Sequence, residues 1–151
     1  MDRRIVQAEL EHVPAVAFNI RPDDARELMV AYDSDPYSII LQSFSISEKC
    51  WTAIVDGEPI AIFGVVMKGA GQGRPWMVGT TALDRHRLKF TKGCQAVIDE
   101  MLSVFPVLEN VVDTRNKRNI RWLRWLGFEF GEIIFVGLQS LPFITFRMEK
   151  A

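Results

Sequence analysis

Residues 110–128 read NVVDTRNKRNIRWLRWLGF, and this stretch decides the fold. Its apolar start completes a predicted strand over 107–112, and the amphipathic run over 116–126 predicts a short helix opened by Asn116. Gly127 stands where a helix commonly ends in a left-handed residue, a conformation that glycine adopts without steric cost. Another strand follows the glycine. The stretch therefore predicts a strand, a short helix and a strand in close succession.

The segments on either side extend this pattern. Residues 84–105 carry apolar side chains on one helical stripe, which predicts the longest helix of the chain. Strands are predicted at 76–83 before this helix and at 128–136 and 142–148 near the C-terminal end. Because a crossover through a helix joins parallel strands, the strands at 76–83 and 107–112 should be parallel neighbours.

The first half of the chain predicts a short edge strand, helices and two strands. In order, these are residues 1–10, helical turns over 12–32, a helix that starts at Pro36, and strands at 50–55 and 59–67. Asp56-Gly57 is typical of a tight hairpin between the two strands, whereas the glycine-rich residues 68–75 predict a flexible loop. We expect a single domain over residues 1–151 with an α+β (α/β) fold, in which a mixed, mostly antiparallel central sheet carries helices on both faces.

Composition excludes several classes of protein. The chain has 151 residues, of which 48% are hydrophobic and 25% charged, as in an ordinary globular domain. It has no apolar run of the roughly 18–20 residues that a membrane helix needs, and its N-terminus lacks the apolar core of a secretory signal. Cys50 and Cys94 form no paired motif, which predicts reduced thiols, and two histidines without metal-ligand spacing predict no metal site.

The net charge of −1 conceals an uneven distribution of charge. Residues 1–60 hold 11 acidic and 5 basic side chains, a charge of −6, whereas residues 61–151 hold 8 and 13, a charge of +5. The basic second part favours an anionic ligand, such as a phosphate group.

The order of elements, together with Asn116, Gly127 and Phe128, resembles the GNAT N-acyltransferases, whose pattern near the C-terminal end is approximately N-x-x-A-x-x-x-Y-x-x-x-G-F. The resemblance implies transfer of an acyl group from acetyl-CoA to an amine. It places the pantetheine arm in a gap between the fourth and fifth strands and the pyrophosphate on amides that open the long helix. The cofactor-binding positions that it implies are Val78, Gly79, Thr80, Thr81, Arg85, Arg87, Lys89 and Asn116.

The sequence departs from the GNAT pattern at two places. The turn before the long helix lacks the R/Q-x-x-G-x-G/A loop, so side-chain charge from the basic residues of this turn would have to replace amide contacts. The tyrosine that often serves as general acid falls at Leu123, which has no proton to donate. Two catalytic candidates remain. His86 could protonate the leaving thiolate, because histidine has an ordinary pKa near neutral pH, and Glu58 could serve as the general base. Both residues also fit ordinary surface positions.

A second resemblance extends over nearly the whole chain. The segments that carry it are CWTAIVDGEP, Pro75-Trp76, LDRHRLKF, ENVVDTRN, IRWLRWLGF and LPFITFRME. They are similar to the family of phage internal virion proteins that includes the product of gene thirteen of short-tailed phages. This resemblance implies an alternative function, a non-catalytic virion or assembly protein with a GNAT fold. It also implies other virion proteins as partners, and a location in the host cytoplasm and then inside the particle.

Basic and aromatic residues interleave in the predicted helix over 116–126, a pattern that can bind nucleic acid through phosphates and stacking. Trp122 and Trp125 are three residues apart, however, and a short amphipathic helix usually packs such a side chain against the core. We therefore expect a CoA-type anion rather than nucleic acid as the partner, and no membrane contact.

Overall fold

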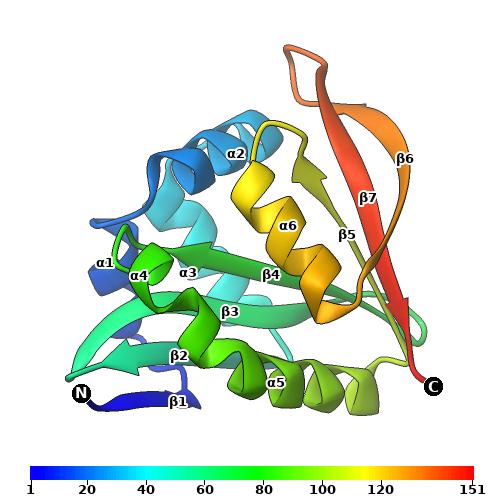
Figure 1. The fold of residues 1–151 in the computed structure, drawn as a ribbon. Coiled ribbons are helices and arrows are strands. Elements are labelled where there is room, and N and C mark those ends of the chain that lie inside the picture. Colours follow the sequence, from blue (N-terminus) through cyan, green and yellow to red (C-terminus); the bar gives the residue numbers. More distant parts are fainter.

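The computed structural model describes all residues 1–151 and contains one seven-stranded sheet (Figure 1). The strands are β1 (Arg3–Gln7), β2 (Lys49–Val55), β3 (Glu58–Gly69), β4 (Gln72–Gly79), β5 (Val107–Asp113), β6 (Glu129–Val136) and β7 (Leu141–Glu149). Their order across the sheet is β1-β2-β3-β4-β5-β7-β6, and β4 with β5 is the parallel pair. The predicted mixed, mostly antiparallel sheet and its parallel neighbours are confirmed.

Helices cover both faces of the sheet. They are α1 (His12–Ala17), α2 (Pro22–Tyr32), α3 (Pro36–Ile46), α4 (Leu83–His86), α5 (Thr91–Val104) and α6 (Lys117–Leu126), with a 3₁₀ turn, η1 (Arg87–Phe90). The first three lie behind the sheet in Figure 1 and the last three in front of it. Side chains alternate along a strand, so Ile62 packs with α1 and α3 while its neighbour Phe63 packs in the core that includes α5 and α6. None of these helices is long and apolar enough to cross a membrane.

Several element boundaries follow from local chemistry, as the sequence predicts. Pro22 and Pro36 occupy first turns, where a missing N–H has no consequence. The Asp35 carboxylate accepts a hydrogen bond of 2.9 Å from the Ser38 amide and caps α3. Gly127 ends α6 with a φ of +106°, the left-handed conformation expected there.

The predicted continuous helix over 84–105 is wrong, because the structure divides this segment into α4, η1 and α5. Between Asp84 and Lys89 the only apolar side chain is that of Leu88, and it is 69% exposed. This part of the segment therefore has no apolar stripe to hold a regular helix against the sheet.

The predicted flexible loop over 68–75 is also wrong. Strand β3 extends to Gly69 and pairs there with Gln72 at the start of β4, so the connection is a tight hairpin. Gly71 has a φ of +70°, which lets the chain turn within this short distance.

Strands β4 and β5 touch at one end and then separate, and Figure 1 shows them diverging. Their pairing is limited to Gln72 with Val107 and Gly73 with Leu108. Gly73 leaves room at this point for the Phe105 ring, two residues before β5, because a Cβ there would lie 2.6 Å from that ring and 2.7 Å from Val65. Beyond this point the two strands leave a gap that widens toward their C-terminal ends.

We expect Gly73→Ala to lower the free energy of unfolding by about 1–3 kcal/mol, because the added methyl group overpacks the point where β4 meets β5. Urea denaturation measures the change. Gly69→Ala is the matched control on the same hairpin, since its nearest contact would be an ordinary 3.6 Å from the Gln72 side chain. Equal effects of the two substitutions would contradict the role of close packing at Gly73.

Candidate functional site

An apolar cavity of about 160 Å³ passes through the sheet at the gap between β4 and β5. Of its 26 lining residues, 21 are hydrophobic. Helices α2 and α3 line it on one face of the sheet, and α5 and α6 line it on the other. The lining residues used below are Glu27, Tyr32, Val78, Cys94, Val97, Ile98, Met101, Asn110, Asn119, Trp122 and Leu123.

A buried arginine closes the wide end of the gap. Arg21 is 5% exposed and lies just before α2. Its guanidinium donates to both carboxylate oxygens of Asp24, at 3.0 and 2.9 Å from Nη2. It also donates to Asp84 Oδ1 at 2.9 Å and to Asn119 Oδ1 at 3.0 Å. One side chain thereby joins the start of α2 to α4 and α6, on the opposite face of the sheet.

Two carboxylates of α2 bind the ends of the separated strands. Asp24 Oδ2 accepts a hydrogen bond of 2.8 Å from the amide of Gly79, the last residue of β4. Glu27 Oε1 accepts one of 2.9 Å from the amide of Asp113, the last residue of β5. Asp24 and Glu27 are three residues apart and so lie on one face of the helix. The amides at the open end of the gap are thus satisfied by the protein itself.

This arrangement changes the acidity of Glu27. Burial, reinforced by the nearby Asp24 charge, raises the pKa of Glu27 to about 8, although the hydrogen bond from the Asp113 amide opposes the change. The carboxyl is therefore mostly protonated at neutral pH. Burial also raises the pKa of Cys94 to about 11, so this thiol stays neutral. Glu27 is thus the lining side chain whose proton is exchangeable near neutral pH.

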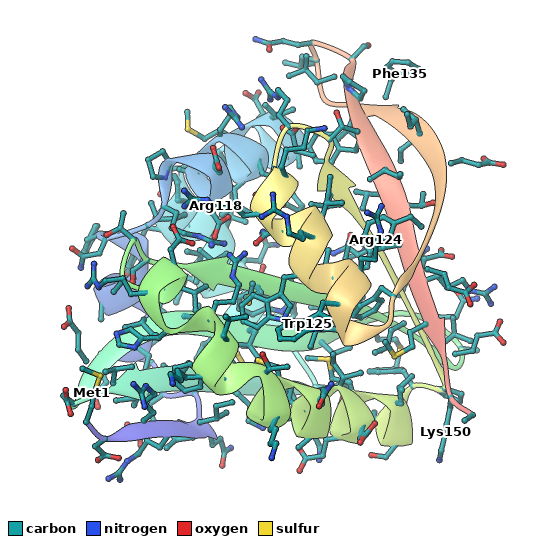
Figure 2. All side chains as sticks on the ribbon, viewed as in Figure 1. Met1, Arg118, Arg124, Trp125, Phe135 and Lys150 are labelled. Atoms are coloured by element: carbon teal, nitrogen blue, oxygen red, sulfur yellow. The ribbon has the colours of Figure 1, made fainter.

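A second, polar pocket lies beside the wide end of the gap, with a volume of about 330 Å³. Its lining residues are Arg21, Pro22, Asp23, Thr81, Asp84, Asn116 and Arg118. Arg118 stands at the end of α6 nearest α2 (Figure 2) and binds Asp84, as does Arg21. Burial and the neighbouring charge of Arg21 lower the pKa of Arg87 to about 10. Three guanidinium groups, those of Arg21, Arg87 and Arg118, therefore surround the Asp84 carboxylate. The pocket lining itself holds two arginines and two aspartates, so its charges balance.

Of the predicted cofactor-binding residues, three lie at the end of β4. Val78 lines the apolar cavity. Gly79 has its amide bound to Asp24. Thr80 is buried, and its hydroxyl donates to the Ile60 carbonyl at 3.2 Å while it accepts from the Ala82 amide at 3.3 Å. The backbone amide of Gly79 and the hydroxyl of Thr80 are therefore already engaged.

Of the other predicted cofactor-binding residues, two line the polar pocket and three line neither cavity. Thr81 and Asn116 line the polar pocket, and Asn116 is 1% exposed, with its Nδ2 at 3.4 Å from both Asp24 and Glu27. Arg87 reaches α6, where it donates to the Arg118 carbonyl at 3.0 Å and to Asn119 at 3.3 Å. Arg85 and Lys89 are exposed and line neither cavity.

The two catalytic candidates lie outside both cavities. Glu58 is exposed at the hairpin between β2 and β3, where it pairs with Val55. His86 ends α4 and is partly buried. Sequence reasoning missed Glu27, although one signal was present: Asp24 and Glu27 adjoin the apolar stripe of α2 at helical spacing.

The two tryptophans of α6 face different surroundings. Trp122 is 4% exposed and carries the Arg87 guanidinium over its ring at 4.7 Å, whereas Trp125 is 58% exposed. Only one of them therefore packs in the core, as the short amphipathic helix suggests.

Elsewhere, potential metal-binding atoms of Glu9, Glu11 and His12 lie within 4.8 Å of one another, outside both cavities. His12 Nδ1 already accepts from the Glu9 amide at 3.0 Å and contacts the Thr52 hydroxyl at 2.8 Å. This histidine therefore has a structural role between α1 and β2.

We expect Arg21→Ala to lower the free energy of unfolding by about 3–5 kcal/mol, because it leaves the buried Asp24 carboxylate without its counter-charge. Urea denaturation at neutral pH measures the loss. Arg26→Ala is the control, since its pair with Asp23 has side chains 40% and 46% exposed and should contribute less than about 1 kcal/mol. Similar small losses for both variants would contradict a stabilising role for the Arg21 network.

Glu27 should also make stability depend on pH. Between its usual pKa of about 4.3 in the unfolded chain and about 8 in the folded protein, the folded state binds more protons than the unfolded state. The free energy of unfolding contributed by this group therefore falls as pH rises through this range and levels off above it. Denaturation of the wild type and Glu27→Gln from pH 5 to pH 9 should show this dependence in the wild type alone. Parallel pH profiles would contradict the assignment.

No protein-family model matches the sequence, and no curated protein matches it in sequence. Solved structures, in contrast, match nearly its full length. An N-acetyltransferase from Staphylococcus aureus Mu50 has a TM-score of 0.75 at 12% identity, over 99% of each chain. An acetyltransferase of the GNAT family from Bacillus anthracis has a TM-score of 0.72 at 9% identity, over 99% of this chain and 95% of that one.

A further match is an acetyltransferase from Bacillus subtilis that was solved in complex with CoA. Its TM-score is 0.68 at 12% identity, and the match covers 99% of this chain and 100% of that one. Identities this low bear on the fold alone. The chain has the fold of the GNAT acetyltransferases, as its C-terminal pattern predicts.

Proposed function

We propose that the protein binds an acyl-CoA at the gap between β4 and β5 and transfers the acyl group to an amine. The observation that carries this proposal is the apolar cavity through the sheet, which opens where the two strands separate. The GNAT resemblance implies acetyl-CoA and a pantetheine arm in this gap. A structural neighbour solved with CoA supports the same class of ligand.

The residues at the gap fit the two ends of such a ligand differently. The apolar lining of the cavity suits an acyl group and the adjoining arm. Arg118 and Arg21 beside the polar pocket suit phosphate groups, because guanidinium binds phosphate through paired hydrogen bonds. The amides of Gly79 and Asp113 are engaged by Asp24 and Glu27, so side-chain charge has to replace amide contacts.

Glu27 is the side chain that we assign to proton transfer. A bound acyl-CoA supplies an activated thioester. When the amine nitrogen bonds to the thioester carbon and the carbon–sulfur bond breaks, the sulfur needs a proton and the amine must lose one. Leu123, at the position of the family's tyrosine, lines the cavity but has no proton to give. Glu27 lines the same cavity in its protonated form and can supply the proton to sulfur. The carboxylate that this leaves accepts the proton that the amine nitrogen loses, which restores the protonated Glu27.

Acetyl-CoA should raise the melting temperature of the wild type, since a ligand at a hundredfold excess over its dissociation constant stabilises by about 2.7 kcal/mol. Free thiol should then appear when a primary amine is added. Arg118→Glu should abolish the thermal shift by removing a guanidinium from the polar pocket. Arg121→Glu is the matched control, because Arg121 is exposed on the same helix and lines neither cavity. Absence of any shift at millimolar acetyl-CoA would contradict acetyl-CoA binding.

The second candidate is a non-catalytic virion or assembly protein of a phage, in keeping with the second resemblance. The observation that favours it is the occupation of the strand amides by Asp24 and Glu27, combined with leucine at position 123. On this proposal the chain functions in the host cytoplasm and within the particle, with other virion proteins as partners. Detection of the chain in purified particles, together with no thermal shift by acetyl-CoA, would favour this candidate.

A further inference from the structure

Every exposed side chain of α6 is basic or aromatic. These side chains are Lys117, Arg118, Arg121, Arg124 and Trp125. Residues three, four and seven apart share one side of a helix, so the five form a single stripe along the helix, which we call the α6 stripe. Figure 2 shows Arg118 toward one end of this helix and Arg124 and Trp125 toward the other. No acidic side chain interrupts the stripe.

Most cations of the α6 stripe have no partner within the protein. Arg118 binds the Asp84 carboxylate. The other three basic side chains have no carboxylate oxygen within 4.0 Å, and one of them, Arg124, lies over the Phe130 ring at 5.2 Å instead. The stripe therefore presents positive charge that the protein itself does not neutralise.

The α6 stripe also opposes the local preferences of a helix. Lys117 and Arg118 lie in the first turn, where the helix dipole favours negative charge, and this turn has no acidic residue. Lys117 and Arg121 are four residues apart, and like charges at this spacing destabilise a helix. Such departures from local stability are typical of functional surfaces. A bound polyanion would relieve both of them.

Further cations without partners lie on the segment that adjoins α6. Arg87 Nη1 donates to the Arg118 carbonyl at 3.0 Å, which holds η1 against the start of the helix. Arg85 and Lys89, on either side of Arg87 in the chain, are exposed and have no carboxylate oxygen within 4.0 Å. Much of the positive charge of residues 61–151 therefore lies along one helix and beside it.

The exposed tryptophan indicates which polyanion fits the stripe. Trp125 is 58% exposed and lies four residues after Arg121, on the same side of α6. Bases of a single-stranded nucleic acid stack on exposed rings of this kind while its phosphates bind neighbouring cations. A membrane surface instead requires an apolar helix face, and the apolar face of α6 packs in the core.

The sequence alone favours a CoA-type anion over nucleic acid, because a short amphipathic helix usually packs its tryptophan against the core. That reason holds for Trp122, which is 4% exposed. It does not hold for Trp125, whose ring is free to stack on a base.

We infer that the α6 stripe binds single-stranded nucleic acid. The phosphates pair with Lys117, Arg121 and Arg124. One base stacks on Trp125. The inference goes beyond the proposed function, since none of these four side chains lines either cavity.

Fluorescence anisotropy of a labelled oligothymidylate tests binding to the full-length protein. If three phosphates are paired, the affinity should fall about 20-fold between about 50 and 200 mM salt, because counterions are released on binding. Arg121→Glu should weaken binding about tenfold or more through loss of a charged hydrogen bond. No binding at the lower salt concentration would overturn the inference.

Arg3→Glu is the matched control for Arg121→Glu. Arg3 is exposed and has no carboxylate oxygen within 4.0 Å, but it lies on β1, away from α6 in Figure 1. The two substitutions change the net charge equally, and Arg3→Glu should leave the affinity nearly unchanged. Equal losses for the two variants would overturn the assignment to the α6 stripe.

Stacking on Trp125 has a separate test. Trp125→Leu should weaken binding of the oligothymidylate about 5- to 100-fold, whereas Trp125→Phe keeps an aromatic ring and should retain most of the affinity. A strand of the same length without bases should bind the wild type more weakly by a similar factor. Equal affinity for the two strands would overturn the inference, as would tighter binding to a duplex of the same length or to phosphatidylglycerol vesicles.

These experiments separate the inference from the proposed function. The melting temperature of each variant without ligand shows that it folds, and Arg121→Glu should keep the thermal shift by acetyl-CoA. Binding of the single strand without a shift by acetyl-CoA would leave the inference standing and contradict the proposed function. A shift by acetyl-CoA without binding of the strand would do the reverse.

Discussion

The ion pair between Arg21 and Asp24 is the interaction on which the rest of the site depends. Both side chains are almost fully buried, so each requires a complete set of partners. Arg21 finds them on three elements, because besides Asp24 of α2 it binds Asp84 of α4 and Asn119 of α6. Asp24 in turn binds the amide of Gly79. Helix α2 is thereby fixed across the open end of β4 and β5, while Gly73 fixes their closed end.

This constraint accounts for the unusual electrostatics of the gap. Holding α2 in place brings Glu27 to the Asp113 amide and close to Asp24, where burial disfavours a second negative charge and keeps the carboxyl protonated. The same network gathers arginines around Asp84. A phosphate group entering the polar pocket would compete with this carboxylate for guanidinium groups that are already paired. An anion that binds in this pocket therefore replaces Asp84 as the partner of these arginines, because none of them is unpaired.

The sequence predicts the features that depend on residues close together in the chain. Pro22, Pro36 and Gly127 mark helix ends through local backbone chemistry. Hydrophobic periodicity gives the order of elements along the chain, and the helical crossover between two of the strands predicts the parallel pair. The cluster at the gap depends on contacts between residues far apart in the chain, such as Arg21 with Asn119, and no local pattern reports them. In the sequence, Glu27 has the pattern of a helix-surface residue. Only the packing of α2 against the sheet places its carboxyl at the Asp113 amide. The GNAT pattern singles out Asn116 as a cofactor-binding position, but its burial and its contacts with Asp24 and Glu27 are not predictable from that motif.

The GNAT pattern concentrates function in one helix, where an asparagine opens the turn and a tyrosine supplies a proton. On the function proposed above, the proton donor of this chain lies on the other face of the sheet from that helix. Helix α6 carries Leu123 at the tyrosine position and the buried Trp122 beside it, and neither side chain releases a proton. The titratable group comes from α2, as Glu27, on the far side of the gap. Residues of α2 and of α6 line the same cavity, so a ligand in the opening between β4 and β5 would contact both helices. The separation of β4 from β5 is therefore the geometric condition for helices on the two faces of the sheet to reach one ligand.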